Sequence, residues 1–165
     1  MIMKKWTELE NSSFFDANAR ERALGMVDEG TFTEFLNPLD RYCSPHLPVL
    51  GTAVEFDDGT VCGVGLLGKH PVFVVSMEGK FIGGAIGEVN GGKMVATIRL
   101  ALKAAADIKA KYPEEYAARR PLVAVSFETG GVRLHEANAG LLAHAEVMDA
   151  FQDCRGIVPV VAVVG

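Results

Sequence analysis

LVAVSFETGGVRLHE, residues 122–136, is the stretch of sequence that decides the fold of this chain. It begins with Leu122–Phe127, a continuous apolar run of strand length that is typical of a parallel strand buried on both faces. A helical pattern then runs from Glu136 to Phe151. One face of this predicted helix carries Leu141, Ala145 and Met148. A strand that passes through a glycine turn into a helix indicates an α/β protein.

Two further segments extend this unit into an alternating pattern. Lys93–Lys109 has apolar residues at helical spacing and is ended by Tyr112-Pro113. Ile157–Val164 reads as a second buried strand, in which Pro159 takes an early position. The order of strands and helices predicts right-handed crossovers with helices layered over a sheet.

A helix and a proline-punctuated connection precede these elements. We expect Asp16 to be the N-cap of the helix, a polar face to carry Arg20, Glu21 and Arg22, and Gly30 to end the segment. The Pro-rich connection that follows separates this helix from the rest of the chain.

We therefore divide the chain into an N-terminal helical arm with its connection, residues 1–47, and a core, residues 48–165. The core opens with strand-like runs, in which β-branched residues either alternate with other residues or occur close together. These runs are Val49–Phe56, Val61–Leu67, Val72–Met77 and Lys80–Ile82, and a hairpin turn at Asp57-Asp58-Gly59-Thr60 separates the first two.

Composition excludes several classes of protein. A net charge of -5 without a basic stripe argues against nucleic acid as a partner. The N-terminus lacks an apolar signal core and no apolar run is long enough to span a membrane, so we expect a cytoplasmic protein. The three cysteines are far apart and contain no Cys-x-x-Cys pair, which indicates free, partly buried thiols without a zinc ribbon.

Several motifs match a functional pattern in the wrong context. GVGLLG, residues 63–68, spells a dinucleotide fingerprint but lies within a strand-like run, so we reject it. His135 and Glu136 start like a zinc-protease helix, but Ala139 stands where the second ligand would be, and we expect no metal. Ser126 lacks the glycine pattern of a nucleophile elbow.

GEVNGGKM, residues 87–94, comes closer to a phosphate loop. Met94 replaces the hydroxyl that would bind magnesium, which argues against nucleotide hydrolysis. Two interpretations stay open at equal weight: a helix start that accepts another phosphate with Lys93 nearby, or a tight loop with a solvated Lys93.

The turn Thr129-Gly130-Gly131-Val132-Arg133 is suited to oxyanion chemistry. Glycines between a strand and a helix let backbone N–H groups converge on a negative oxygen. A thioester enolate carries its charge on the carbonyl oxygen, where fixed amide donors stabilise it. Taken alone, the turn fits better with a helix N-cap by Thr129.

Three segments resemble acyl-CoA carboxyltransferases of the crotonase-like superfamily. Residues 126–136 resemble the family's SGGARxxE strand-to-helix segment, and residues 19–32 resemble its ARER and LLDEGSF helix. FIGGAIG, residues 81–87, with Lys93 resembles its GGSxG segment. The segments FETGGVRL, residues 127–134, and EANAGL, residues 136–141, are most similar to those of the biotin-independent malonate decarboxylase β subunits.

The resemblance implies a crotonase-like (ClpP/crotonase) core of ββα units and a catalytic activity. With a γ subunit in a hetero-oligomer, the chain would decarboxylate malonyl thioester on an acyl carrier protein to acetyl thioester and carbon dioxide. The carrier arm would be a phosphoribosyl-dephospho-CoA group, or CoA, with no covalently bound cofactor and no biotin.

Carried over by position, Gly130, Gly131 and Val132 would supply catalytic amides near the thioester carbonyl. The resemblance places Gly83, Gly84 and Lys93 near the pantetheine or nucleotide end of the substrate. Arg133 also falls at a substrate-site position, although with Glu136 it reads first as a buried pair that orients the turn. No side chain is assigned as acid or base.

The resemblance also implies that the core is truncated at its C-terminal end, because the family continues past Gly165 with a loop that supplies a second donor. Two alternatives remain: a biotin-dependent acyl-CoA carboxyltransferase β subunit, and a non-catalytic assembly module that docks a γ-like partner.

Overall fold

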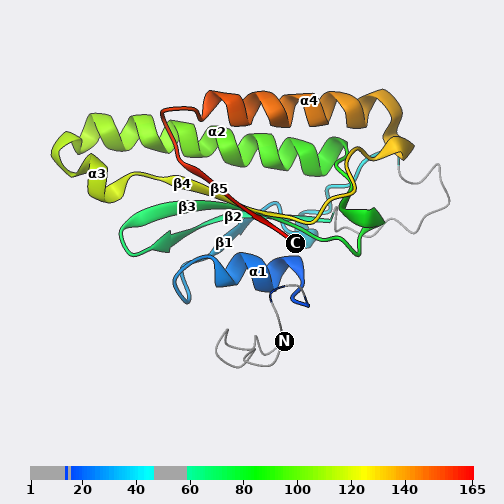
Figure 1. Ribbon diagram of the computed structural model, residues 1–165, viewed down its shortest axis with the longest axis horizontal. Helices are drawn as coiled ribbons and strands as arrows, with labels where there is room; N and C mark the ends of the chain where they lie inside the picture. The colour runs from blue at the N-terminus through cyan, green and yellow to red at the C-terminus, as the bar shows by residue number, and fades with distance from the viewer. Residues whose placement is uncertain (1–13, 15, 47–58) are drawn as a thin grey trace.

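A single mixed sheet organises the molecule, and helices lie on both of its faces (Figure 1). The computed structural model describes residues 14, 16–46 and 59–165. The strands are β1 (Thr33–Phe35), β2 (Thr60–Leu67), β3 (His70–Met77), β4 (Leu122–Phe127) and β5 (Val160–Val164), and they follow one another across the sheet in chain order.

The direction of each strand follows from its connection. β2 and β3 are antiparallel because only Gly68 and Lys69 join them. β3, β4 and β5 are parallel because a helix crosses over between each pair. The register sets Ser76 opposite Ser126, so that β3 and β4 end at the same edge of the sheet.

Two long helices cover one face of the sheet and a short helix covers the other (Figure 1). α2 (Glu88–Lys111) and α4 (Ala137–Asp153) lie side by side on the first face, and α1 (Ala19–Gly25) packs on β2 and β3 from the second. α3 (Tyr116–Arg119) completes the α-helices of the described residues. Short 3-10 helices span Pro38–Asp40, Ile82–Gly84, Pro113–Glu115 and Leu134–Glu136.

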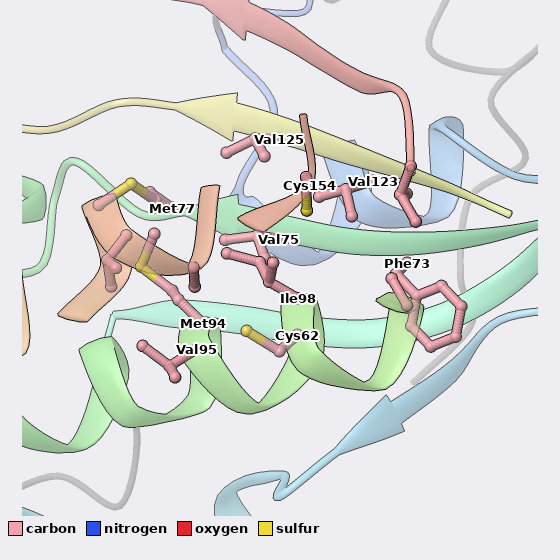
Figure 2. Close-up of a cluster of buried hydrophobic side chains, with 14 of the residues drawn as sticks. Cys62, Phe73, Val75, Met77, Met94, Val95, Ile98, Val123, Val125 and Cys154 are labelled. Atoms are coloured by element: carbon pink, nitrogen blue, oxygen red, sulfur yellow. The ribbon is translucent and has the colours of Figure 1, made fainter. Parts of the chain in front are cut away.

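The larger core fills the space between the sheet and the two long helices (Figure 2). Met94 and Ile98 of α2 meet Val75 of β3 and Val125 of β4 there. Burial of a side chain of this kind stabilises the fold by roughly 1.5–3 kcal/mol. A smaller cluster, which includes Ala23 of α1 and Val74 of β3, lies on the opposite face.

Most of the predicted elements are confirmed. The predicted strands at Val61–Leu67, Val72–Met77 and Leu122–Phe127 are present, as are the helices predicted at Lys93–Lys109 and Glu136–Phe151. The α/β class is confirmed as a mixed sheet. The predicted strand Val49–Phe56 and half of the predicted turn at residues 57–60 lie outside the described residues.

Three local predictions were wrong. Lys80–Ile82 is not a strand, because a turn leads there into the 3-10 helix of residues 82–84. The N-cap of α1 is Asn18 rather than Asp16, and its side chain accepts from the amide of Glu21 in a capping box. Arg22 is buried rather than on a polar face.

The phosphate-loop interpretation of residues 87–94 is also corrected. α2 begins at Glu88, so Gly91, Gly92 and Lys93 lie within the helix and not in a loop before it. A Cβ on Gly91 would lie 2.9 Å from the Cβ of Ala143, so this glycine allows α2 and α4 to pack closely. Lys93 is buried, in contrast to the solvated lysine of the second interpretation.

Two apolar surfaces are more exposed than their patterns predict. β5 was expected to be buried, yet all five of its residues are exposed, because no described helix packs closely over its faces. In α4, Leu141, Ala145 and Met148 share a face as predicted, but they face outward, while Val147 and Ala150 pack on the core.

No helix among the described residues is long and apolar enough to cross a membrane. The cysteines Cys43, Cys62 and Cys154 are free, as predicted. Burial raises the pKa of the Cys154 thiol, and the carboxylate of Asp153 adds to this effect.

Candidate functional site

The two glycine segments singled out in the sequence lie side by side. One is the turn Thr129–Arg133 after β4, and the other is the segment Phe81–Gly87 between β3 and α2. The Gly130 amide donates to the Gly83 carbonyl oxygen over 2.8 Å, and Ile86 pairs with Val132 in a parallel bridge. Because β3 and β4 are parallel neighbours, their carboxyl ends deliver both segments to one place.

Gly84 shows how closely the segments approach. Its φ is +67°, and a Cβ built on it would lie 1.8 Å from the carbonyl oxygen of Glu128. A residue with a side chain would therefore both be strained and push the two segments apart. Ile82, a β-branched residue, also has a positive φ, of 48°, which strains the loop beside the turn. Gly83 adopts its φ of 63° without that strain, because it has no Cβ.

The three predicted amide donors of the turn differ in availability. Gly130 N–H is engaged by Gly83, and Gly131 N–H donates to Thr129 Oγ1 over 3.1 Å. Within the residues that the structure describes, the Val132 amide has no hydrogen-bond acceptor. Of the three predicted donors, Val132 is thus the one whose N–H is not already bonded within the described residues.

The alternative in which Thr129 caps a helix is wrong. α4 begins only at Ala137, and its N-cap is Glu136 without a side-chain cap. Between the turn and α4 stands the 3-10 helix Leu134–Glu136. The Thr129 hydroxyl instead closes the turn itself by accepting from Gly131.

Arg133 and Glu136 form the buried pair predicted from the sequence. Arg133 Nη1 lies 2.9 Å from Glu136 Oε1, and neither side chain has any exposed surface. Arg133 also donates to the Ala85 carbonyl oxygen, and the second oxygen of Glu136 accepts from the Glu88 amide. The carboxylate therefore occupies the N-terminus of α2, where an external phosphate was one option from the sequence.

Lys93 lies on the inward side of α2. Its ammonium donates to the Thr60 carbonyl oxygen over 2.6 Å at the start of β2, and the residue is 7% exposed. The structure therefore brings together Gly83, Gly84, Gly130, Gly131 and Val132, and it sets Lys93 against β2 instead.

Glu128 is the residue of this region that sequence reasoning did not single out. It lies directly before Thr129, and its carboxylate accepts from the Arg22 guanidinium and from the Gly79 amide. The hydrogen bond from Arg22 is the main reason why the pKa of Glu128 is lowered, and the charge of Lys80 contributes. The signal in the sequence was an acidic residue immediately before the turn, but its partner is 106 positions away.

The arrangement can bind a carbonyl oxygen that gains negative charge. Fixed backbone donors in a turn held by buried contacts need no reorganisation when that charge develops. Among residues 14, 16–46 and 59–165, no group of three or more metal-ligating side chains occurs.

Known proteins resemble this chain in both sequence and fold. The chain is 61% identical, over 163 residues, to malonyl-S-ACP:biotin-protein carboxyltransferase of Malonomonas rubra, a match that covers 99% of this chain and 51% of the relative. A chain of a Pseudomonas malonate decarboxylase hetero-tetramer in complex with malonate superposes with a TM-score of 0.78 at 38% identity, over 91% of this chain and 51% of that one. No protein-family model matches.

A transcarboxylase 12S structure is similar in fold, with a TM-score of 0.73 at 24% identity over 90% of this chain and 25% of that chain. The mixed sheet with its covering helices therefore has the fold of this carboxyltransferase structure. At higher identity, the chain is similar to subunits of malonate decarboxylase and of malonyl-S-ACP:biotin-protein carboxyltransferase. It spans about half the length of the first relatives that it matches, 51% in both cases.

Proposed function

We propose that the chain forms the thioester-binding part of a malonate decarboxylase β subunit, which acts on malonyl thioester carried by an acyl carrier protein. The observation that carries this proposal is the Val132 amide, which has no acceptor within the described residues and lies where two glycine segments meet. Similarity to these relatives suggests the reaction class, and the turn supplies a group that fits it.

The chemistry needs little from side chains. The bond between the α-carbon and the carboxylate of malonyl thioester breaks, carbon dioxide leaves, and the electron pair passes into the thioester as an enolate. Amide donors at the carbonyl oxygen stabilise this enolate, and a proton added to the α-carbon gives acetyl thioester. Since the donors act where charge develops, they lower the barrier more than they strengthen substrate binding.

The remaining substrate contacts are also proposals, and fewer observations support them. Gly83 and Gly84 lie beside the turn and fit the pantetheine end of the arm, where a backbone without side chains allows close approach. Lys93 at the nucleotide end stays a prediction, because contact with substrate requires its bond to the Thr60 carbonyl to break. Arg133 is fully buried, so we propose that it shapes the turn and does not touch substrate.

We propose a γ subunit and an acyl carrier protein as partners, in a hetero-oligomer. The support is that the Pseudomonas relative is described as a hetero-tetramer and the Malonomonas relative is named for malonyl-S-ACP. A phosphoribosyl-dephospho-CoA arm on that carrier remains part of the proposal.

A second candidate is transfer of the carboxyl group to a biotin protein. It is favoured by the name of the Malonomonas relative, which gives a biotin protein as acceptor. The first step is the same, and the two candidates differ only in whether carbon dioxide is released or captured. A third alternative is that the chain docks a γ-like partner and takes no part in catalysis.

The test is to assemble the chain with its partner subunits and measure carbon dioxide release from malonyl-carrier, with and without added biotin protein. Release that is independent of biotin protein and insensitive to avidin supports the decarboxylase. Carboxylated biotin protein as the main product supports the transferase. Tight assembly with neither product overturns the catalytic proposal and leaves the docking module.

A further inference from the structure

The glycine turn is connected to the opposite face of the sheet through one side chain. α1 lies on the face away from α2 and α4, as Figure 1 shows. From this helix Arg22, which is only 3% exposed, reaches the edge of the sheet where β3 and β4 end. A buried cation of this kind must be fully hydrogen-bonded to be tolerated.

The Arg22 guanidinium joins the ends of the two strands. Its Nη1 atom donates to the Met77 carbonyl oxygen over 3.1 Å at the end of β3. The same nitrogen lies 2.5 Å from Glu128 Oε2, one residue after β4. Its Nε atom donates to the carbonyl oxygen of Phe14, which ties the chain before α1 to the same group.

Glu128 in turn touches both glycine segments. Its Oε2 atom accepts from the Gly79 amide over 3.1 Å, in the loop that leads to residues 81–87. Its carbonyl oxygen lies against Gly84, at the position where a Cβ would clash. The next residue, Thr129, accepts from the Gly131 amide. The placement of Glu128 therefore decides where the turn begins and how closely the two segments lie.

We infer that Arg22 and Glu128 are positioning residues, which hold the glycine turn of the thioester site from the far side of the sheet. The inference rests on the proposed function of that turn. Neither residue needs to touch the substrate. A displacement of the turn by about 1 Å would be enough to cost on the order of 10²-fold in rate.

Acid breaks the ion pair, and the charges around Glu128 lower its pKa and thus the pH at which this happens. Arg22 faces it from α1 and Lys80 from the loop after β3, while Glu78 is turned to the N-terminus of α1, where it accepts from the Ala19 amide. Since the pKa of Glu128 is lowered, the ion pair is complete above the ordinary pKa of a glutamate and is lost as pH falls through the lowered value.

The test compares Arg22→Met and Glu128→Gln with a matched control in the assembled complex. The control is Arg20→Met, which breaks a 2.8 Å ion pair between Arg20 on the same helix and Glu34 in β1. β2 and β3 separate β1 from β4, the strand that leads into the turn. For malonyl-carrier turnover we expect kcat to fall about 10²-fold in Arg22→Met with a smaller change in KM. The control should keep its kcat, and Arg22→Lys should recover part of the loss.

The pH profile separates positioning from a loss of general stability. In Arg22→Met the pKa of Glu128 returns toward its ordinary value, so the acid limb of kcat moves to higher pH. In Glu128→Gln that limb disappears. If Arg22→Met and Arg20→Met have the same kcat and the same acid limb, the inference is overturned.

Amide hydrogen exchange makes the test independent of activity. In the folded Arg22→Met variant, exchange of a peptide covering residues 129–133 should be faster than in Arg20→Met. Equal exchange in the two variants contradicts positioning. A wild-type complex that produces neither carbon dioxide nor carboxylated biotin protein refutes the proposed function, whereas the exchange comparison still decides the inference.

Discussion

At the scale of single residues, the backbone amide of Val132 is the group on which the proposed chemistry depends. Its side chain is not involved, so a side-chain substitution cannot test it. Replacing the Val132 amide by an ester removes the N–H and keeps the shape of the chain. We expect kcat of the assembled complex to fall about 10²–10³-fold, as for the loss of one oxyanion donor.

Val132→Ala is the control for this prediction, because it shortens the side chain and keeps the donor. It should retain most of the turnover. An ester variant that turns over as fast as Val132→Ala would remove Val132 from the oxyanion assignment. Gly131→Pro would also remove an N–H donor, but it is a poorer test because Gly131 has a φ of +104° that proline cannot adopt.

Gly84 offers a second prediction at this scale. Gly84→Ala adds a Cβ that meets the Glu128 carbonyl oxygen at 1.8 Å, on a residue with positive φ. We expect the free energy of unfolding to fall by about 3 kcal/mol, from strain and overpacking together. Urea denaturation measures this change.

Gly83→Ala is the matched comparison, since Gly83 has a similar φ of +63° but nothing within 4 Å of an added Cβ. Only the left-handed conformation is then costly, by about 1–2 kcal/mol. Equal losses in the two variants would mean that the close contact of Gly84 with Glu128 does not contribute.

At the scale of elements, the start of α2 is joined to the end of the turn by a buried carboxylate. Glu136 holds Arg133 through one oxygen and the Glu88 amide through the other. Glu136→Gln leaves Arg133 without its counter-charge in a fully buried place. We expect a loss of about 3–5 kcal/mol in the free energy of unfolding, which thermal or urea denaturation would detect.

An exposed ion pair between α2 and α4 serves as the control. Arg99 and Glu146 lie 3.2 Å apart with side chains 61% and 48% exposed. Glu146→Gln should change stability by less than about 1 kcal/mol, because water already screens both charges. Similar losses of unfolding free energy in Glu136→Gln and Glu146→Gln would show that burial does not determine how much each ion pair stabilises the protein.

At the scale of the whole molecule, β5 is an apolar edge strand. Val161 is 52% exposed, and β5 pairs only with β4 among the described strands. Such an edge can pair with a strand of another molecule. We expect Val161→Lys to reduce concentration-dependent association of the isolated chain, as measured by light scattering, with little change in its unfolding midpoint.

Thr33→Lys, on the opposite edge in β1, is the control and should leave association unchanged. If Val161→Lys associates as strongly as the unchanged chain, the edge of β5 is not the surface responsible.

Much of the fold could be predicted because its helices and strands have clear periodicity. The continuous apolar run Leu122–Phe127 became a buried parallel strand, and the spacing in Lys93–Lys109 became α2. Periodicity could not give the orientation of α4, because both of its faces contain apolar residues. Only packing against α2 decides that Val147 is buried and Met148 exposed. The boundary at residues 47/48 stays a prediction.

The sequence by itself determined most of the order of strands and helices, the glycine turn at residues 129–133 and the buried pairing of Arg133 with Glu136, because each depends on neighbours within a few positions. Tertiary structure alone decided that Gly83 meets Gly130, that Lys93 faces Thr60, and that Arg22 holds Glu128. These contacts join residues from 33 to 106 positions apart, and one of them depends on parallel strands ending at the same edge. No local pattern encodes such a meeting, since it depends on how the sheet folds as a whole.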